Sequence, residues 1–478
     1  MQEQILNFVA KANGILADYI LIFLLVAVGL FFTIKTRFVQ VRCFGEGMKK
    51  VFGNIKLVGG KNKGGLSSFQ ALATAIAAQV GTGNIVGASG AILTGGPGAI
   101  FWMWVIAFLG MATIYAEAVL AQETRITDAN GEIHGGPVYY IKKAFPNGFG
   151  SFLAGFFAIA VILALGFMGS MVQSNSIAGS METVFDANKA NILFSLGGID
   201  VTVTAAIVGA IIAIVAAFIF IGGINRIASV TEKLVPIMAC LFLVGGLVVI
   251  FANITKIPAT FAMIFKYAFT PNALIGGGIG YALKTAISQG AKRGLFSNEA
   301  GMGSTPHAHA MANVEKPHDQ GVVAMVGVFI DTFVVLTMTA LVVITCLFTD
   351  IAATGNAADY AAALEGVTKA NAMQLAVGSV FGSSFGSIFV AICLLFFAFS
   401  TILSWNFFGK VNIQYLFKNN KIATVLYSVI AIAFIFLGAL LSNDLVWELT
   451  DFFNYLMVIP NAIALFALYK VVVNASKK

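Results

Sequence analysis

The sequence predicts an all-α integral membrane protein with about eleven transmembrane helices, and three observations lead to this prediction. Of the 478 residues, 59% are hydrophobic and only 10% are charged, whereas soluble domains carry about 25% charged residues. The chain is divided into apolar runs long enough to cross a bilayer. One run, at 66–94, contains a polar, glycine-rich break at 81–84. Lipid cannot satisfy the backbone groups that such a break frees, so it predicts a binding site inside the membrane.

The apolar runs define the expected spans. They fall at 17–35, 66–94, 98–121, 150–176, 201–222, 230–252, 272–304, 321–348, 374–405, 422–441 and 447–470. An acidic residue precedes the first run and no small-residue cleavage site follows it, so we interpret this run as a retained helix rather than a signal peptide. The four cysteines are scattered and show neither a metal-binding spacing nor the pattern of a disulfide framework.

The basic residues predict the orientation of the spans. The loop at 35–65 holds eight of the 28 Lys and Arg residues, and the alternate loops hold eleven more, against five in the opposite loops. Under the positive-inside rule, this asymmetry predicts an N-terminus outside the cell and a cytoplasmic C-terminus. These loops also explain the net charge of +7, so we expect a lipid bilayer and no nucleic acid as a partner.

A short internal repeat predicts how the spans are arranged. The hexapeptide ALATAI at 71–76 recurs as ALKTAI at 282–287, and glycines follow each copy, at 81–84 and at 290–294. The copies lie five spans apart, so they cross the membrane in opposite directions. This is the pattern of a 5+5 inverted repeat with two broken helices. We therefore expect an N-terminal helix and basic loop at 1–65, a first five-helix repeat at 66–252 and a second at 272–474.

The first break offers groups for a zwitterion and for a cation. A helix that stops exposes carbonyl groups and one that restarts exposes N–H groups, at the negative and positive ends of the dipoles. We expect an amino acid to bind at the break through Gln79, Gly81, Thr82, Gly83 and Asn84. Oxygen atoms for Na⁺ would come from Ala77, Val80, Asn84, Ser400 and Thr401. The alternative is a glycine kink that serves only helix packing.

The seventh span contains charges that are costly in lipid. Lys292, Arg293 and Glu299 lie within it or at its end, where a charge at mid-bilayer costs about 3 kcal/mol. An ion-pair network without ligand contact is one explanation for these three residues. Better candidates for contact with a ligand or ion in the predicted second break are Gln289, Gly290, Ser297 and Asn298.

Other polar residues within spans are further candidates. We expect Glu117 in the third span to form a salt bridge to a basic residue. For Asp331 in the eighth span, a role in joining helices and a role in cation binding or gating both remain open. Gln173 and Asn175 in the fourth span either reach the pocket or join helices. Thr401 and Trp405 lie one turn apart on one face of the ninth span, where the indole would either cap a small apolar pocket or anchor at the interface.

Three stretches carry a resemblance to a known family. These are GGPGAIFWMWVIAFLG at 95–110, GTGN at 81–84 and KRGLFSNEAGMGS at 292–304. The first resembles the signature of the alanine or glycine:cation symporter family over all sixteen positions. The resemblance implies a LeuT-like fold, uptake of alanine or glycine with Na⁺, and a bacterial or archaeal plasma (inner) membrane. By the same resemblance, substrate contacts would come from Gly81 to Asn84, Gln173, Gln289, Gly290, Thr401 and Trp405, and the cation site from Ala77, Val80, Ser400 and Thr401.

The sequence thus predicts a secondary transporter that couples inward symport of a small neutral amino acid to Na⁺. A proton-coupled amino-acid permease of the same fold is the main alternative, with Asp331 or Glu117 as the proton carrier. An ion channel is another alternative. An enzyme is not expected, because the four histidines form no HExxH motif and no nucleophile with a neighbouring base stands out.

Overall fold

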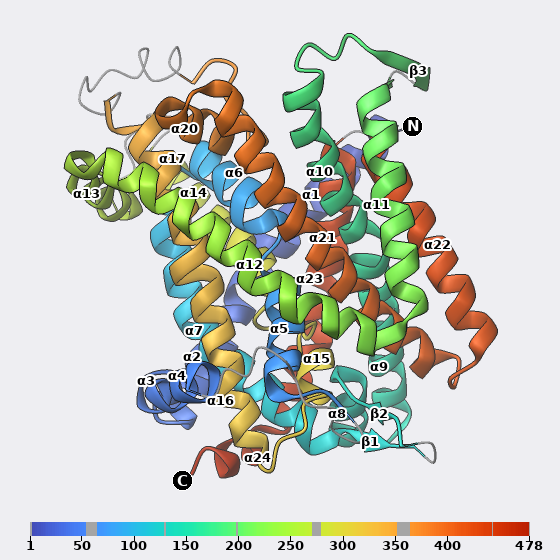
Figure 1. Cartoon of the computed structure of the whole chain (residues 1–478). Coiled ribbons are helices and arrows are strands. Elements are labelled where there is room, and N and C mark those ends of the chain that lie inside the picture. The colour runs from blue at the N-terminus through green and yellow to red at the C-terminus, as the bar shows by residue number, and fades with distance from the viewer. Residues whose placement is uncertain are drawn as a thin grey trace.

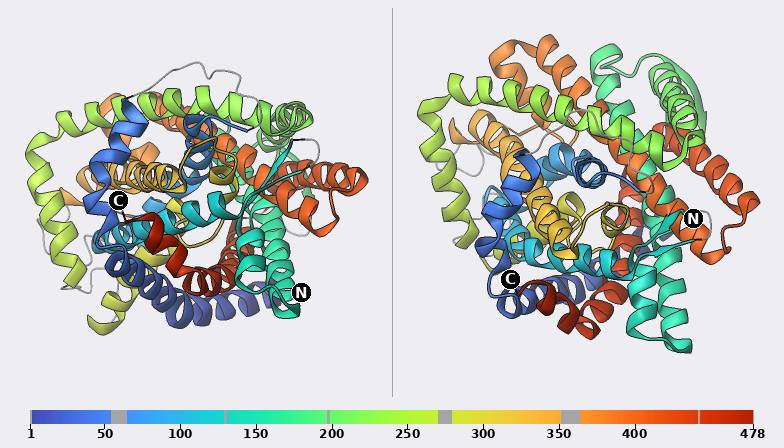
Figure 2. Two further views of the ribbon diagram at one scale, coloured as in Figure 1. Left: turned by 90° about the horizontal axis from the view of Figure 1, so that it is seen from below. Right: turned by 60° about the horizontal axis from the view of Figure 1, so that its bottom comes forward.

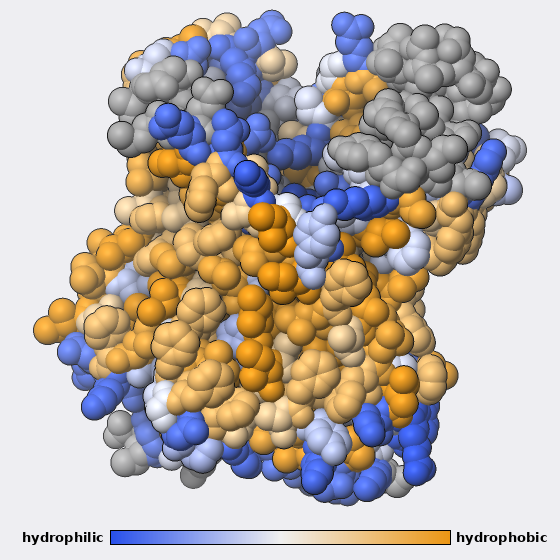
Figure 3. All heavy atoms as spheres, turned by 180° about the vertical axis from the view of Figure 1, so that it is seen from behind, coloured by the Kyte–Doolittle hydropathy of each residue, from blue (hydrophilic) through white to orange (hydrophobic). Residues whose placement is uncertain are grey.

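The computed structural model describes residues 2–53, 65–128, 131–196, 199–269, 279–350, 364–441 and 443–477. The helices form a bundle whose N-terminus lies at the upper end and whose C-terminus lies at the lower end (Figure 1). On the face seen in Figure 3, a broad apolar band crosses the middle of the bundle between two more hydrophilic ends. A bundle that crosses a membrane presents such a band to the lipid.

The elements follow one another in this order. In the first half of the chain they are α1 (Gln2–Ile15), η1 (Leu16–Leu21), α2 (Ile22–Lys35), α3 (Val39–Arg42), α4 (Phe44–Phe52), α5 (Ser68–Gln79), η2 (Gly83–Gly87), α6 (Ala88–Gly95), α7 (Gly98–Thr124), β1 (Ile126–Thr127), β2 (Ile133–His134), α8 (Pro137–Ala144), α9 (Gly148–Val161), η3 (Ile162–Gly169), α10 (Ser170–Phe185), β3 (Ile192–Leu196), β4 (Ile199–Thr202), α11 (Val203–Ile221) and α12 (Gly223–Ala252). The second half comprises η4 (Ile254–Lys256), α13 (Ile257–Phe269), α14 (Ile279–Asn298), α15 (Pro306–Ala310), α16 (Pro317–Val328), η5 (Phe329–Leu336), α17 (Thr337–Leu347), α20 (Ala372–Phe381), α21 (Ser383–Leu416), α22 (Lys421–Leu440), α23 (Asn443–Ala467) and α24 (Tyr469–Ala475). Two antiparallel hairpins, β1 with β2 and β3 with β4, are the only sheets among these elements.

The prediction of a membrane bundle is confirmed, with a slightly smaller number of spans. Nine helices in the described part of the chain are long and apolar enough to cross a membrane, and one bent pair adds a tenth. The predicted span at 272–304 is not among them. Its helix, α14, carries Lys284, Lys292 and Arg293, and the residues just before it, 270–278, lie outside the described part.

Two predicted boundaries differ from the structure for local reasons. The expected ninth span at 374–405 is divided, because Gly382 has a φ of +88° and ends α20 before α21 begins. A side chain is strained at such an angle, so glycine permits the turn. The first span begins earlier than expected, at Gln4 rather than at residue 17, because α1, η1 and α2 form one continuous helix.

The first broken helix is confirmed, and it is the one bent span found among the described residues. The pair α5 and η2–α6 bends by 45° at residues 80–82. The predicted break at 290–294 is wrong, because α14 is helical throughout that stretch. The chain leaves the helix only after Asn298 and passes through 299–305 before α15 begins. We call the segment 299–305, between α14 and the short helix α15, the second break. Glu299, Gly301 and Gly303 all have positive φ angles there, of 57°, 95° and 79°.

Helices α5 and α14 meet at their C-terminal ends. At its start, α5 is held to the lower end by the bond from the Ser68 hydroxyl to Gln320 at the start of α16. At its C-terminal end, the Gln79 side chain donates a hydrogen bond to the carbonyl of Asn298, the last residue of α14, at 2.7 Å. Viewed from below, α1–α2 and α12 run along opposite edges of the bundle, with α5 and α15 between them (Figure 2). The division of the chain into inverted repeats at 66–252 and 272–474 stays a prediction.

Candidate functional site

The first break is stabilised by amide side chains. Helix α5 begins with a capping box between Ser67 and Gln70 and consists mainly of small residues. The backbone leaves the helix at Val80, and the freed N–H of Gly81 donates to Oδ1 of Asn84 at 2.9 Å. The N–H of Thr82 donates to Oε1 of Gln173, on α10, at 3.0 Å. Protein groups therefore satisfy two of the donors that the break exposes, as a bilayer interior requires.

One polar atom at this break has no protein partner. The hydroxyl of Thr82 is fully buried and forms no hydrogen bond within the described part of the chain. Leaving a buried hydroxyl unpaired costs about 1–3 kcal/mol. The position of this atom, in the residue whose N–H binds Gln173, makes it available to a bound ligand.

Hydroxyl groups of α21 lie directly against the end of α5. The Thr401 hydroxyl donates to the carbonyl of Ala77 at 2.8 Å, and the Ser400 hydroxyl lies 3.5 Å from the same oxygen. A glycine is needed opposite them, because a Cβ on Gly81 would come within 2.4 Å of Oγ1 of Thr401. The sequence prediction that Ala77, Ser400 and Thr401 come together thus agrees with the geometry, and these three residues present oxygen atoms at one place.

Asp331 connects the first break with α14. One carboxylate oxygen accepts a hydrogen bond from Nδ2 of Asn84 at 2.6 Å, and both oxygens accept from the hydroxyl of Ser297, at 2.9 and 3.1 Å. The Thr332 hydroxyl also donates to it, at 2.9 Å. Asp331 is fully buried. Its hydrogen bonds join η5 to η2 and to α14. They place one carboxylate next to both the first break and the end of α14.

The second break is arranged around Glu117 of α7. The carboxylate accepts hydrogen bonds from the N–H groups of Gly301 and Gly303, at 3.2 and 3.0 Å. The Asn461 side chain on α23 donates to the same carboxylate and to the carbonyl of Gly301. The salt bridge expected for Glu117 is wrong: among the described residues its partners are amide groups. Backbone donors of an irregular segment bind an anion well because several can converge on it.

Glu299 and Trp405 form a buried pair beside this break. The indole N–H donates to Oε1 of Glu299 at 2.5 Å, and the Ser304 hydroxyl donates to the other oxygen. The Trp405 ring is almost entirely buried and contacts Gly169, where a Cβ would come within 2.4 Å of the ring. The Phe296 ring meets the indole edge-on, with centroids 6.0 Å apart. Trp405 is therefore a wall of the molecular interior and not an anchor at the membrane interface.

Lys292 and Arg293 of α14 have acidic partners. Arg293 forms an ion pair with Asp451 of α23 at 2.9 Å, and its guanidinium lies over the Trp447 ring, 5.1 Å from the centroid. Lys292 lies 3.5 Å from a carboxylate oxygen of Asp18, in η1. The ion-pair explanation therefore holds for these two residues, whereas Glu299 is not part of their network.

Comparison with known proteins identifies the family. The model of the sodium:alanine symporter family matches residues 2–478. The chain belongs to this family. It is 39% identical over 478 residues to the sodium/alanine symporter AgcS of Methanococcus maripaludis, covering 99% of this chain and 97% of that one. It is 38% identical over 477 residues to the probable sodium/glutamine symporter GlnT of Bacillus subtilis, covering 100% and 91%.

A solved structure agrees with the fold of this sodium:alanine symporter family member. The chain is similar to MhsT in complex with L-phenylalanine, with a TM-score of 0.57 and 15% identity, over 87% of this chain and all of that one. The fold is therefore LeuT-like, as expected. Family membership also shows that the protein is a multi-pass, sodium-coupled amino-acid symporter of the membrane and not an enzyme.

Two of the predicted substrate residues lie apart from the breaks. A Cβ on Gly290 would meet the carbonyl of Ala99 at 2.7 Å, and Gln289 contacts Gly95. Gly290 thus packs against the start of α7, and Gln289 lies against the end of α6. They lie eight or more residues before the end of α14, which is about 12 Å along a helix. As ligand contacts they stay predictions, but the structure does not bring them to Gly81 or Asn84.

The sequence analysis missed two residues that hold the site together. Asp451 and Asn461 both lie in α23 and are buried. They bind Arg293 and Glu117 respectively. A signal was present, because a carboxylate and an amide inside the last apolar run are as costly there as the ones that were noted.

Proposed function

We propose that this symporter carries alanine and glycine into the cell together with Na⁺. One observation carries the proposal: the hydroxyls of Ser400 and Thr401 point at the carbonyl of Ala77, where α5 has just lost its helical hydrogen bonds. In the proposed cation site, these oxygens and the Val80 carbonyl bind Na⁺. The ion then ties α21 to the first broken helix.

The amino acid would bind beside the ion, at the first break. Its carboxylate would lie at the N–H groups of Gly81, Thr82 and Gly83, displacing the neutral oxygens of Gln173 or Asn84, since a charged acceptor forms the stronger bonds. The unpaired hydroxyl of Thr82 would gain a partner. The ammonium group of the bound amino acid would lie toward the carboxyl groups of Asp331 and Glu299. A small side chain fits this site because Trp405 and Phe296 fill the space beyond it.

Coupling would arise because ion and substrate bind the same broken helix. Na⁺ would hold the end of α5 in the geometry that the amino acid needs, and the amino acid would reciprocally raise the affinity for Na⁺. Alternating access would then move the broken helices against the surrounding bundle. In the proposed orientation, the basic residues of the 35–53 segment face the cytoplasm and the N-terminus lies outside.

The test is uptake of radiolabelled alanine by proteoliposomes at fixed pH, with Na⁺ replaced by K⁺. We expect uptake to require Na⁺ and to be competed by glycine and unlabelled alanine more strongly than by glutamine. Undiminished uptake in K⁺ with a proton gradient would reject Na⁺ coupling. Stronger competition by glutamine would retain the symport and reject the proposed substrate.

A further inference from the structure

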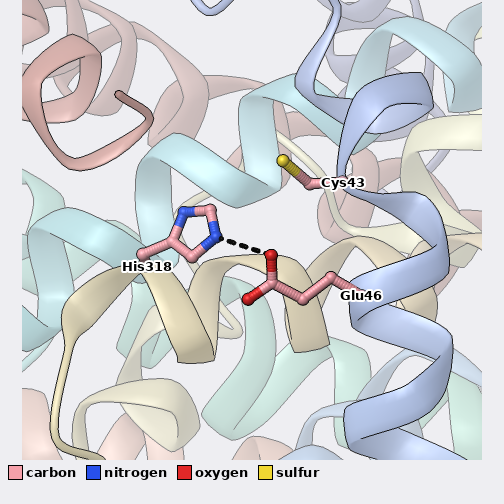
Figure 4. Close-up of side chains that lie close together, drawn as sticks. All are labelled: Cys43, Glu46 and His318. Carbon is pink, nitrogen blue, oxygen red and sulfur yellow. Dashed lines mark hydrogen bonds and ion pairs between the residues drawn. The ribbon is translucent and has the colours of Figure 1, made fainter. Parts of the chain in front are cut away.

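A group of three potential metal ligands lies far from the site described above. The side chains of Cys43, Glu46 and His318 point toward one another (Figure 4). They come from α3–α4 and α16, which meet at the lower end of the bundle (Figure 1). The Cys43 sulfur, a Glu46 carboxylate oxygen and a His318 ring nitrogen all lie within 4.8 Å of one another. A thiol, a carboxylate and an imidazole together form a ligand set typical of transition metals.

Local structure brings these residues together. Cys43 lies at the junction of α3 and α4, and Glu46 follows it by three residues, which puts both on one face of the helix. Helix α4 crosses α16 at Gly47, where a Cβ would come within 2.6 Å of the Val322 carbonyl. This close approach carries α4 onto the first turn of α16, where His318 follows Pro317.

The histidine is oriented by a second contact. Nδ1 of His318 lies 2.8 Å from the hydroxyl of Tyr115, on α7, and Nε2 lies 3.4 Å from Oε2 of Glu46. In protein metal sites, one imidazole nitrogen binds the metal while the other is held by a neighbouring group. Only 3% of the His318 side chain is exposed, against 34% for Glu46. The three residues thus combine a buried, oriented imidazole with an opening to solvent.

We propose that Cys43, Glu46 and His318 form a transition-metal site whose preferred ion is Zn²⁺. Metal–ligand distances of about 2.0–2.3 Å in a tetrahedral site place ligand atoms about 3.5 Å apart. Side-chain movements of about 1 Å would therefore be enough to close this site. The Cys43 thiol would lose its proton to solvent on binding, and water would take the fourth position. Mg²⁺ and Ca²⁺ would bind poorly, because they prefer oxygen ligands alone.

Neighbouring charges would exchange partners when the metal binds. Lys50 lies 3.9 Å from Glu46 and 3.2 Å from Asp319. Without the metal, Lys50 supplies the positive charge near both carboxylates. With the metal bound, Zn²⁺ would neutralise the charge of Glu46, and Lys50 would keep its ion pair with Asp319.

The proposed function gives this site a consequence for transport, and this part rests on that function. The metal would fasten α4 to α16, and α16 continues into η5, which carries Asp331. Any step of the transport cycle that moves α16 relative to α4 would be slowed. We therefore expect Zn²⁺ to inhibit uptake from a place well away from the substrate.

Binding is tested on the purified full-length protein with Co²⁺ as the probe. We expect one Co²⁺ per chain, with the near-ultraviolet band of a cobalt–thiolate bond and the visible bands of a tetrahedral site, both abolished by added Zn²⁺. Cys43→Ser should remove the thiolate band. Glu46→Gln, at a partly exposed position, should weaken binding at least tenfold without harming folding. Cys240→Ser, at an exposed cysteine of α12, is the matched control and should leave the band unchanged.

Other outcomes overturn the proposal in distinguishable ways. No thiolate band in the unaltered protein, or an equal band in Cys43→Ser, would mean that the three residues form only a structural contact. In proteoliposomes with Zn²⁺ on both faces, inhibition of Na⁺-dependent alanine uptake should disappear in Cys43→Ser. It should persist in the control His134→Ala, which changes a histidine of β2 that lies beside Asp128. Uptake unaffected by Zn²⁺ in a protein that binds Co²⁺ would overturn the effect on transport and leave the metal site standing. Failure of uptake under all conditions would instead contradict the proposed function.

Discussion

The two helix breaks differ in how their backbone groups are satisfied. At the first, residues 80–82 bend the chain by 45°, and the neutral amides of Asn84 and Gln173 accept from the freed N–H groups. At the second, residues 299–305 include three positive φ angles, and the carboxylate of Glu117 accepts from Gly301 and Gly303. The first break is thus filled by amide oxygens that a ligand can replace, and the second by the carboxyl group of Glu117, a side chain of the protein itself.

This difference separates a place for a ligand from a place for structure. A substrate carboxylate would compete poorly with Glu117, because that side chain is covalently part of the protein and is also held by Asn461. It would compete well with an amide oxygen, because charge-assisted hydrogen bonds are roughly twice as strong as neutral ones. The first break is therefore the better site for the amino acid, and the second serves better to hold α7, α14 and α23 together.

The largest effect is expected for Asn84→Ala at the first break. The change removes the acceptor for Gly81 and a donor to Asp331, both fully buried. We expect alanine uptake in proteoliposomes to fall at least 100-fold while the protein still inserts, an effect of about 3 kcal/mol. Asn175→Ala is the control, because Asn175 on the same α10 as Gln173 binds only carbonyls of Gly438 and Leu441. Near-normal uptake by Asn84→Ala would remove this residue from the site.

The next effect distinguishes the two carboxylates at the second break. Glu117→Gln takes the charge from an acceptor of two backbone N–H groups, so we expect a lower thermal unfolding midpoint and about tenfold less uptake, since bonds to charged groups contribute about 1.5–3 kcal/mol each. Glu299→Gln should keep the midpoint and raise the KM for alanine. Thermal unfolding in detergent and uptake kinetics measure both. Equal effects of the two variants on KM and on the unfolding midpoint would contradict the assignment of Glu117 to structure and of Glu299 to substrate binding.

A comparable loss of uptake is expected when the ion pair between Arg293 and Asp451 is broken. Asp451→Asn leaves the buried guanidinium of Arg293 without its partner, so we expect about a tenfold loss of uptake, because an unpaired buried charge is strongly destabilising. The double variant Arg293→Gln with Asp451→Asn should recover part of this loss. A double variant worse than Asp451→Asn alone would show that Arg293 acts on transport by more than this pair.

The smallest effect concerns substrate size. Trp405→Phe shortens the wall beside Gly169 and removes the hydrogen bond to Glu299. We expect uptake of valine and glutamine, relative to alanine, to rise about threefold. This is less than the roughly tenfold or more that one methylene group is worth in a pocket, because the Phe ring still fills most of the space of the indole. Trp104→Phe, at an indole that binds Thr337 instead, is the matched control. An unchanged substrate range would mean that the Trp405 ring does not limit the pocket.

The sequence by itself determined the membrane bundle, the family and the first break. Glycine, threonine and asparagine inside an apolar run are visible without any structure, because each raises the cost of an unbroken helix in lipid. The same reasoning misplaced the second break at 290–294. Glycine only weakly disfavours a helix. Gly290 and Gly294 instead allow α14 to pack closely on Ala99 and Met103 of α7.

The tertiary structure alone decided where the second break lies and what holds it. The positive φ angles at Glu299, Gly301 and Gly303 persist because Glu117, from a helix far away in the sequence, binds the freed N–H groups. The sequence likewise did not reveal that Arg293 pairs with Asp451 of α23 and Lys292 with Asp18 of η1. Local sequence shows the cost of a buried polar group, but which distant group offsets that cost depends on how the helices pack.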